Sequence, residues 1–102
     1  MDIYQGENGE LFFQGLPARL DEISDLQIVF SLRKRELLRK GISDCTLQDE
    51  TVILPLTQAD TLAFPRGRID CTMLLLLTNG DRAESGPMPC VIRRTVHPEV
   101  LT

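Results

Sequence analysis

The stretch Gly67-Arg68-Ile69-Asp70-Cys71-Thr72-Met73-Leu74-Leu75-Leu76-Leu77-Thr78-Asn79-Gly80-Asp81 decides the predicted fold of this chain. Its apolar run stops at Asn79-Gly80, and both of these residues adopt positive φ at little cost. An Asn-Gly pair therefore favours the type I′ turn that joins two antiparallel strands. We predict a central strand that leads into a β-hairpin, with residues 88–96 as its second arm.

Apolar and polar residues alternate in several other short segments, including residues 10–14 and 51–56. About seven such strands, at roughly ten-residue spacing with turn signals between them, are typical of an all-β sandwich. The inward faces of these strands supply the predicted core: Leu11, Phe13, Leu26, Ile28, Phe30, Leu32, Val52, Leu54, Ile69, Cys71, Met73 and Leu75.

Two local signals mark the segment that follows residue 51. Pro55 has no amide hydrogen to donate, so it must face an open sheet edge or a bulge. Thr57 and Asp60 match the Ser/Thr-x-x-acid pattern of a helix start, and Pro65 leaves room for about one turn. We predict one short helical turn near Gln58–Leu62.

Residues 25–40 admit two interpretations. Leu26, Ile28 and Phe30 alternate with more polar neighbours, which is the period of a half-buried strand. A helix is the alternative, with Ser24 as its N-cap and Gly41 just after its end. The apolar residues of the segment would surround most of such a helix instead of forming one stripe. We therefore favour two strands, at residues 26–34 and 37–43.

Length and composition limit the class of protein. The 102 residues, 42% of them hydrophobic and 25% charged, predict a single domain at 1–97 with a flexible tail at 98–102. The net charge of −4 makes nucleic acid an unfavoured partner, because phosphate contacts need a basic surface. The apolar run at residues 73–77 is too short to cross a bilayer, and the N-terminus has no signal core. We expect a protein that is cytoplasmic on synthesis and has no membrane partner.

Three cysteines, Cys45, Cys71 and Cys90, are widely spaced and form no C-x-x-C motif. Neither a zinc site nor a redox motif is indicated. Free cysteine is among the most buried residue types, so we favour reduced thiols in the core. A disulfide between Cys71 and Cys90 is the alternative, because the two would lie on the arms of one hairpin.

Several segments occur in a recognisable order along the chain. They are Ile3-Tyr4-Gln5-Gly6-Glu7, Asp25-Leu26-Gln27-Ile28-Val29-Phe30-Ser31-Leu32-Arg33-Lys34, Val52-Ile53-Leu54-Pro55-Leu56-Thr57-Gln58-Ala59-Asp60-Thr61, Arg66-Gly67-Arg68-Ile69-Asp70 and Leu77-Thr78-Asn79-Gly80-Asp81. In this order they resemble the small immunoglobulin-like β-sandwich proteins of tailed phages and prophages, and are similar to the N-terminal module of baseplate upper proteins. The chain departs from that pattern at Ile69, where an aromatic residue is common, and at Phe64-Pro65, which replaces a plainer turn.

The resemblance covers residues 3–96 and implies an immunoglobulin-like antiparallel β-sandwich. It also implies a structural role in a virion, in the tail or baseplate. Its motifs consist of strand and turn residues, so it carries no catalytic or ligand-binding residue to this chain.

No group of residues in the sequence forms a recognisable catalytic or cofactor site. His97 is the one histidine and has no neighbouring base, nucleophile or second metal ligand. The pairs Asp21-Glu22 and Asp49-Glu50 lie in expected loops, where carboxylates are solvated and are not opposed across a cleft. We therefore predict no catalytic residues, no cofactor, no metal and no enzymatic activity.

Charge is distributed unevenly along the chain. Residues 1–25 hold six acids and one base, whereas five of the eleven basic residues fall within residues 33–40: Arg33, Lys34, Arg35, Arg39 and Lys40. We predict that these five form a protein-interaction patch that meets an acidic surface on another protein or on a second copy. No aromatic residues lie among them for stacking on nucleic-acid bases.

The sequence thus favours a non-enzymatic structural or assembly module that acts by protein–protein association, with a homo-oligomer as one form of that association. The alternative is a small ligand-binding or carbohydrate-binding sandwich. Sugar sites commonly use exposed aromatic rings, and this chain has no Trp and one Tyr.

Overall fold

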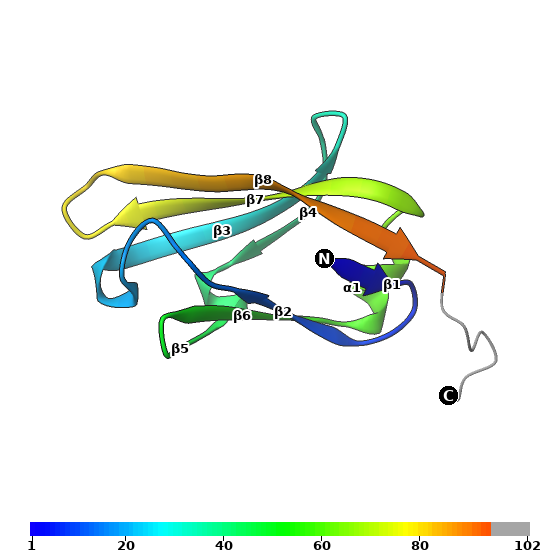
Figure 1. The fold of residues 1–102 in the computed structure, drawn as a ribbon, viewed down its shortest axis with the longest axis horizontal. Helices are drawn as coiled ribbons and strands as arrows, with labels where there is room; N and C mark the ends of the chain where they lie inside the picture. Colours follow the sequence, from blue (N-terminus) through cyan, green and yellow to red (C-terminus); the bar gives the residue numbers. More distant parts are fainter. Residues whose placement is uncertain (95–102) are drawn as a thin grey trace.

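Two stacked β-sheets form the fold of residues 1–94, the part of the chain that the computed structural model describes (Figure 1). The larger sheet has the strand order β1-β8-β7-β3-β4, made of Asp2–Tyr4, Arg82–Arg93, Gly67–Leu77, Ile23–Leu32 and Arg35–Gly41. The smaller sheet has the order β2-β6-β5, made of Gly9–Phe13, Thr51–Leu56 and Thr46–Gln48. Three short helical segments complete the described chain: η1 (Leu20–Glu22), η2 (Ile42–Asp44) and α1 (Gln58–Leu62).

The strand connections identify the type of sandwich. Strands β8, β7 and β3 are neighbours in one sheet and β2, β6 and β5 in the other, with antiparallel pairing throughout except between β1 and β8. This arrangement matches the G-F-C and B-E-D strands of an immunoglobulin domain, with β4 added beside β3 as in variable-type domains. The predicted immunoglobulin-like antiparallel β-sandwich is confirmed.

The contested segment forms two strands and no α-helix. Leu32 pairs with Arg35, so the β3–β4 hairpin turns at Arg33-Lys34, where φ is +51° and +68°. Positive φ at both central residues is the signature of a type I′ turn. The predicted strand bounds were therefore wrong by a few residues, because an Arg-Lys pair gives no turn signal in the sequence.

The β7–β8 hairpin is confirmed, but its turn is not the predicted type I′ turn. Gly80 has φ +92°, and Asn79 keeps a negative φ while its Oδ1 accepts from the Asp81 N–H at 2.8 Å. The Gly80 N–H donates to the Leu77 carbonyl at 2.9 Å, and the Leu77 N–H donates to the Asp81 carbonyl at 2.8 Å. Thr78, Asn79 and Gly80 thus form a loop that is longer than the two residues of a type I′ turn. The side chain of Asn79 closes this loop with its hydrogen bond, and Asn79 does not adopt a positive φ.

The second arm of this hairpin begins at Arg82 and not at residue 88. The strand continues through Gly86 because the β7–β8 register shifts between Cys71 and Met73. Gly86 has φ +110°, and a Cβ there would lie 2.8 Å from the Cys71 carbonyl oxygen. Only glycine fits this bulge, so the Gly-Pro pair that resembles a loop in the sequence lies inside a strand.

Side chains between the sheets match the predicted core closely. Eleven of the twelve predicted residues are buried, and Leu32, next to the turn that projects from the larger sheet away from the smaller one, is half-buried (Figure 1). Phe64 was not predicted; its ring packs on that of Phe30 with centroids 5.1 Å apart. Cys90, predicted as a buried thiol, is also in the core, and the remaining core residues, which were not predicted, are Ile3, Ile23, Leu56 and Ile92.

Other local predictions can be compared with the same residues. The helical turn at Gln58–Leu62 is confirmed, with Thr57 as its N-cap. Pro55 lies past the last residue that β6 pairs with β5, so it does face an open edge. The predicted tail at 98–102 and His97 lie outside the described residues.

The cysteines are free thiols in this structure, as favoured. Cys71 and Cys90 are buried on neighbouring strands, whereas Cys45 is only half-buried. Burial, together with the nearby Asp44 carboxylate, raises the pKa of the Cys45 thiol to about 11. The thiolate, which is the reactive form, is thereby disfavoured at neutral pH.

Candidate functional site

The predicted basic patch is divided between two places. Arg33 and Lys34 form the β3–β4 turn, and Arg35 begins β4; all three side chains are exposed. None of the three forms a salt bridge with another residue of the described range 1–94. Their charges are therefore available to a partner.

Arg39 is held by its own hairpin. Its Nη2 lies 2.7 Å from Glu36 Oε1, its Nε donates to the same oxygen at 3.1 Å, and Nη1 donates to the Gln27 side chain. The hydrogen bond from Arg39 lowers the pKa of the Glu36 carboxyl. Arg39 is exposed, but its charge is locally neutralised.

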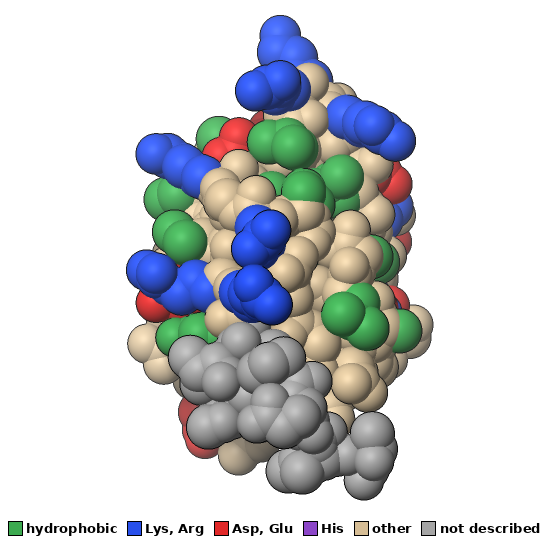
Figure 2. Space-filling view, turned by 90° about the vertical axis from the view of Figure 1, so that its right-hand side faces the viewer, with side chains coloured by type: hydrophobic (Ala, Val, Ile, Leu, Met, Phe, Trp, Pro, Cys, Tyr) green, Lys and Arg blue, Asp and Glu red, His purple; other side chains and the backbone are tan. Residues whose placement is uncertain are grey.

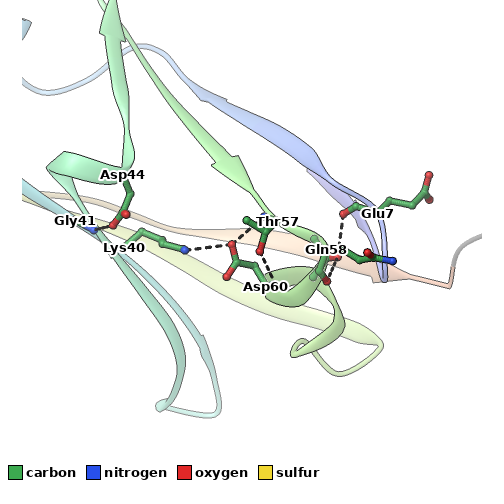
Figure 3. A network of polar contacts seen from close by, with 8 residues as sticks. Glu7, Lys40, Gly41, Asp44, Thr57, Gln58 and Asp60 are labelled. Atoms are coloured by element: carbon green, nitrogen blue, oxygen red, sulfur yellow. Dashed lines mark hydrogen bonds and ion pairs between the residues drawn. The ribbon is translucent and has the colours of Figure 1, made fainter. Parts of the chain in front are cut away.

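Lys40 has a structural role. It lies opposite the buried Ile28, so its side chain extends along the rim between the sheets, and Nζ reaches Asp60 Oδ2 at 3.2 Å (Figure 3). The side chains of Lys40 and Asp60 are only 20% and 12% exposed. The pair joins the edge strand of the larger sheet to α1, which follows the central strand of the smaller one. The prediction that Lys40 belongs to an interaction patch is therefore not supported by its position.

Asp60 also caps the helix to which it belongs. Its Oδ2 accepts from the Thr57 N–H at 2.9 Å, and its own N–H donates to Thr57 Oγ1 at 3.1 Å (Figure 3). Burial raises the pKa of the Asp60 carboxyl, but the bonds from Thr57 and Lys40 outweigh burial and lower it. Asp60 is thus held ionised at the rim of the sandwich.

Four further basic residues, which lie outside the predicted patch, join Arg33, Lys34 and Arg35. Arg66 and Arg68 flank the first residue of β7, while Arg93 ends β8 and Arg94 follows it. The β7–β8 register places Gly67 opposite Ile92, so these two segments lie side by side. The β3–β7 register pairs Ser31 with Asp70, which brings the β3–β4 turn to the same end of the sheet.

We call this surface the basic end. It consists of seven exposed cationic residues: Arg33, Lys34, Arg35, Arg66, Arg68, Arg93 and Arg94. Figure 2 shows Lys and Arg side chains gathered from the top of this face to its middle. Two carboxylates lie among them: Asp2, whose Oδ1 is 3.4 Å from Arg93 Nε, and the half-buried Asp70. The surface combines three segments that are far apart in sequence, so only the strand register could have revealed it.

Carboxylates gather at the opposite end of the long axis, where the β7–β8 turn, η1 and the β5–β6 turn meet (Figure 1). The Glu50 carboxylate accepts from the Leu20 N–H at 3.1 Å, and the Glu22 carbonyl accepts from the Thr78 N–H at 2.9 Å. These bonds tie the three segments together. We call this surface the acidic end, which consists of Asp21, Glu22, Asp25, Asp49, Glu50, Asp81 and Glu84.

The acidic end carries few compensating cations. Arg19 lies 3.4 Å from Asp21 Oδ1 and 3.2 Å from Glu22 Oε1, and Arg82 follows the β7–β8 turn. The predicted division of charge along the sequence is therefore only partly reproduced in space. Asp2, counted with the N-terminal acids, lies at the basic end instead.

A shallow groove runs across the outer face of the larger sheet beside the acidic end. Its volume is about 260 Å³, and Leu74 and Leu76 line it together with Asp25 and Arg82. Asp25 pairs with Leu76, which pairs with Arg82, so the three side chains form one row across β3, β7 and β8. The groove offers apolar surface between a carboxylate and a guanidinium group.

The described residues do not assemble a metal-binding cluster. No cluster of three His, Cys, Asp or Glu side chains within residues 1–94 could hold a metal ion. Asp21-Glu22 and Asp49-Glu50 are exposed at the acidic end, where Glu22 and Glu50 line a surface hollow of about 370 Å³ beside Arg19. None of the helices among residues 1–94 is long and apolar enough to cross a membrane.

No protein-family model matches this chain, and no curated protein matches it. Among solved structures, extracellular domains 3–5 of Drosophila OTK are similar to it at 17% identity and a TM-score of 0.39. The match covers 92% of this chain but 31% of that one. A likeness this distant says nothing about what this chain binds.

Proposed function

We propose that this domain is a non-enzymatic structural or assembly module that acts by association with another protein through its basic end. The observation that supports the proposal is the gathering of seven exposed cationic residues at one end of a protein whose net charge is −4. The resemblance to virion proteins of tailed phages and prophages suggests a setting for such a module, in a tail or baseplate.

The composition of the basic end suits a protein partner with an acidic surface. Six of its seven cations are arginines, which bind carboxylates through two parallel hydrogen bonds. Tyr4 pairs with Arg93 across β1 and β8, and its side chain is 41% exposed. Tyr and Arg, together with Trp, are enriched among the residues that dominate binding energy at protein interfaces.

A ligand-binding or carbohydrate-binding sandwich is the second candidate, and the groove beside the acidic end is where its ligand would bind. The residues that line this groove are aliphatic or polar and include no aromatic ring. Sugar rings are commonly held by stacking on aromatic side chains, so the groove favours this candidate less than the basic end favours protein association.

The proposal can be tested by photo-cross-linking in the cells that produce the protein. A benzophenone side chain replaces Tyr4 at the basic end or, as the matched control, Phe12, an aromatic residue of β2 that is 56% exposed on the smaller sheet. We expect a defined protein adduct from position 4, identified by mass spectrometry, and a strong reduction of that adduct by Arg66→Glu/Arg68→Glu. Equal adducts from both positions, or adducts that survive the charge reversal, would contradict the proposal.

A further inference from the structure

We infer that the partner of the basic end is the acidic end of a second copy of this chain, so that copies associate head to tail. This inference rests on the proposed function and names the partner. Each copy carries both surfaces: Figure 1 shows the turns that belong to the acidic end at one end of the long axis, and Figure 2 shows the basic end viewed from the other.

The two ends are complementary in charge and in number. The basic end presents seven cations, of which Arg93 is paired with Asp2, and the acidic end presents seven carboxylates, of which two are paired with Arg19. Most of the charges on both surfaces therefore have no salt-bridge partner among residues 1–94. Complementary charged surfaces speed encounter and fix the relative orientation of two proteins.

The groove beside the acidic end supplies an apolar contact as well as charge. Arginine side chains bury their aliphatic stems on apolar surface while the guanidinium group remains near an anion. Leu76 is 39% exposed next to Asp25, with Leu74 in the same groove. An arginine of the incoming basic end would lie with its stem on these leucines and its charge at Asp25.

The positions of the two surfaces determine the type of assembly. A contact between different surfaces of identical chains is heterologous, and it leaves the free end of each copy able to bind another. The described part of the chain is elongated, with extents of 48 × 28 × 19 Å, and its ends do not overlap. Head-to-tail association therefore produces rows of copies, or rings where the rotation between neighbours closes.

Open sheet edges provide a weaker route to association. Edge strand β4 carries a bulge at Leu37, because Phe30 pairs with Leu38 and Ser31 with Glu36. Along β8, the edge that β1 leaves free contains Pro87 and Pro89. Bulges and prolines are the usual protection against strand addition, so we assign the contact to the charged ends.

The test uses multi-angle light scattering and analytical ultracentrifugation of purified protein at low and high salt. Wild-type protein should form concentration-dependent oligomers at low salt and dissociate at high salt, because screening weakens exposed charge pairs. Arg66→Glu/Arg68→Glu at the basic end and Asp25→Lys/Glu84→Lys at the acidic end should each weaken self-association by about tenfold or more. Glu10→Lys is the control: it changes the net charge in the same direction as the acidic-end variant, by half as much, but lies on the smaller sheet opposite Pro55, and it should leave association unchanged.

Mixing the two charge-reversed variants provides the decisive measurement. The basic-end variant retains a native acidic end, and the acidic-end variant retains a native basic end. An equimolar mixture should therefore recover the association that each variant alone loses, and circular dichroism should show that both are folded. A monomeric wild-type protein at low salt and high concentration would overturn the inference, as would oligomers that both variants retain. If cross-linking at Tyr4 still captures a different protein in that case, the proposed function stands and only the identity of the partner fails.

Discussion

The β3–β4 and β7–β8 hairpins are both antiparallel, but they differ in the charge of their turns, in their position in the sheet and in the turn signal that the sequence gives. The first ends in a basic turn beside an edge strand, and the second ends in an acidic turn with β7 at the centre of the sheet. Asn79-Gly80 predicts the position of the β7–β8 turn. The β3–β4 turn has Arg33 and Lys34 at positive φ, and this pair gives no turn signal in the sequence. Both hairpins contribute buried side chains to the core, through β3 and β7, but the exposed turn of the edge hairpin carries charged side chains at positive φ.

The largest expected effect is a loss of stability that should be greater for a leucine in the central strand β7 than for one in the edge strand β4. Leu75 of β7 is buried, so Leu75→Ala should lower the free energy of unfolding by about 2–5 kcal/mol through lost apolar contact and a cavity. Leu37, half-buried at the bulge of β4, is the matched control, and Leu37→Ala should cost about 1 kcal/mol or less. Urea denaturation measures both. Equal losses would show that β4 belongs to the core as fully as β7 does.

The next effect is the loss of stability expected when either of two glycines in the β7–β8 hairpin is replaced by alanine. Both have positive φ, but a Cβ at Gly86 would lie 2.8 Å from the Cys71 carbonyl oxygen, whereas nothing lies within 4 Å of one at Gly80. Gly80→Ala should cost about 1–2 kcal/mol for the backbone conformation alone. Gly86→Ala should cost about 1–3 kcal/mol more, because the strand must also move. Thermal unfolding of the two variants would contradict the bulge if Gly86→Ala were the milder change.

A smaller effect concerns the ion pair that fixes the β3–β4 hairpin to α1. Asp60→Asn removes the charge that Lys40 and the Thr57 N–H stabilise, and should cost about 1–2 kcal/mol at neutral pH. Because the pKa of Asp60 is lowered in the folded protein, its stabilising effect is full above the unfolded pKa and is lost as pH falls through the folded value. The wild-type and Asp60→Asn proteins should therefore converge in stability below about pH 4.

Chemical denaturation at a series of pH values measures that convergence. Glu10→Gln, at an exposed carboxyl of β2, is the control and should have no effect that depends on the ion pair. A difference between wild type and Asp60→Asn that stayed constant from pH 7 to pH 3 would assign the loss to helix capping by the side chain rather than to its charge.

The smallest effect is expected when the β3–β4 turn receives the residues that a type I′ turn prefers. Arg33→Asn/Lys34→Gly should raise the free energy of unfolding by about 0.5–1 kcal/mol, since Asn and Gly adopt positive φ more readily than Arg and Lys. The same variant removes two charges from the basic end, so it should gain stability while it loses association. A loss of stability would indicate that the Arg and Lys side chains make contacts that outweigh their backbone strain.

Strands and core were largely predictable because their signals are local. Alternation identified Leu11, Phe13, Val52 and Leu54 as core residues, and Thr57 with Asp60 identified the helical turn. The bulge at Gly86 could not be predicted, because its glycine is required by the Cys71 carbonyl of another strand. The turn at Arg33-Lys34 was missed for a similar reason: tertiary pairing of β3 and β4 imposes a conformation that these residues do not prefer.

The sequence by itself determined that this chain forms short antiparallel strands around an apolar core, because residue alternation and turn residues act over a few positions. Only the tertiary structure decided how its charges are distributed. Strand register brought Arg66, Arg68, Arg93 and Arg94 to the turn at Arg33-Lys34, and contact between the sheets removed Lys40 from that surface by pairing it with Asp60. Charge acts through space, so its pattern is set by which strands lie side by side and not by which residues are neighbours in the chain.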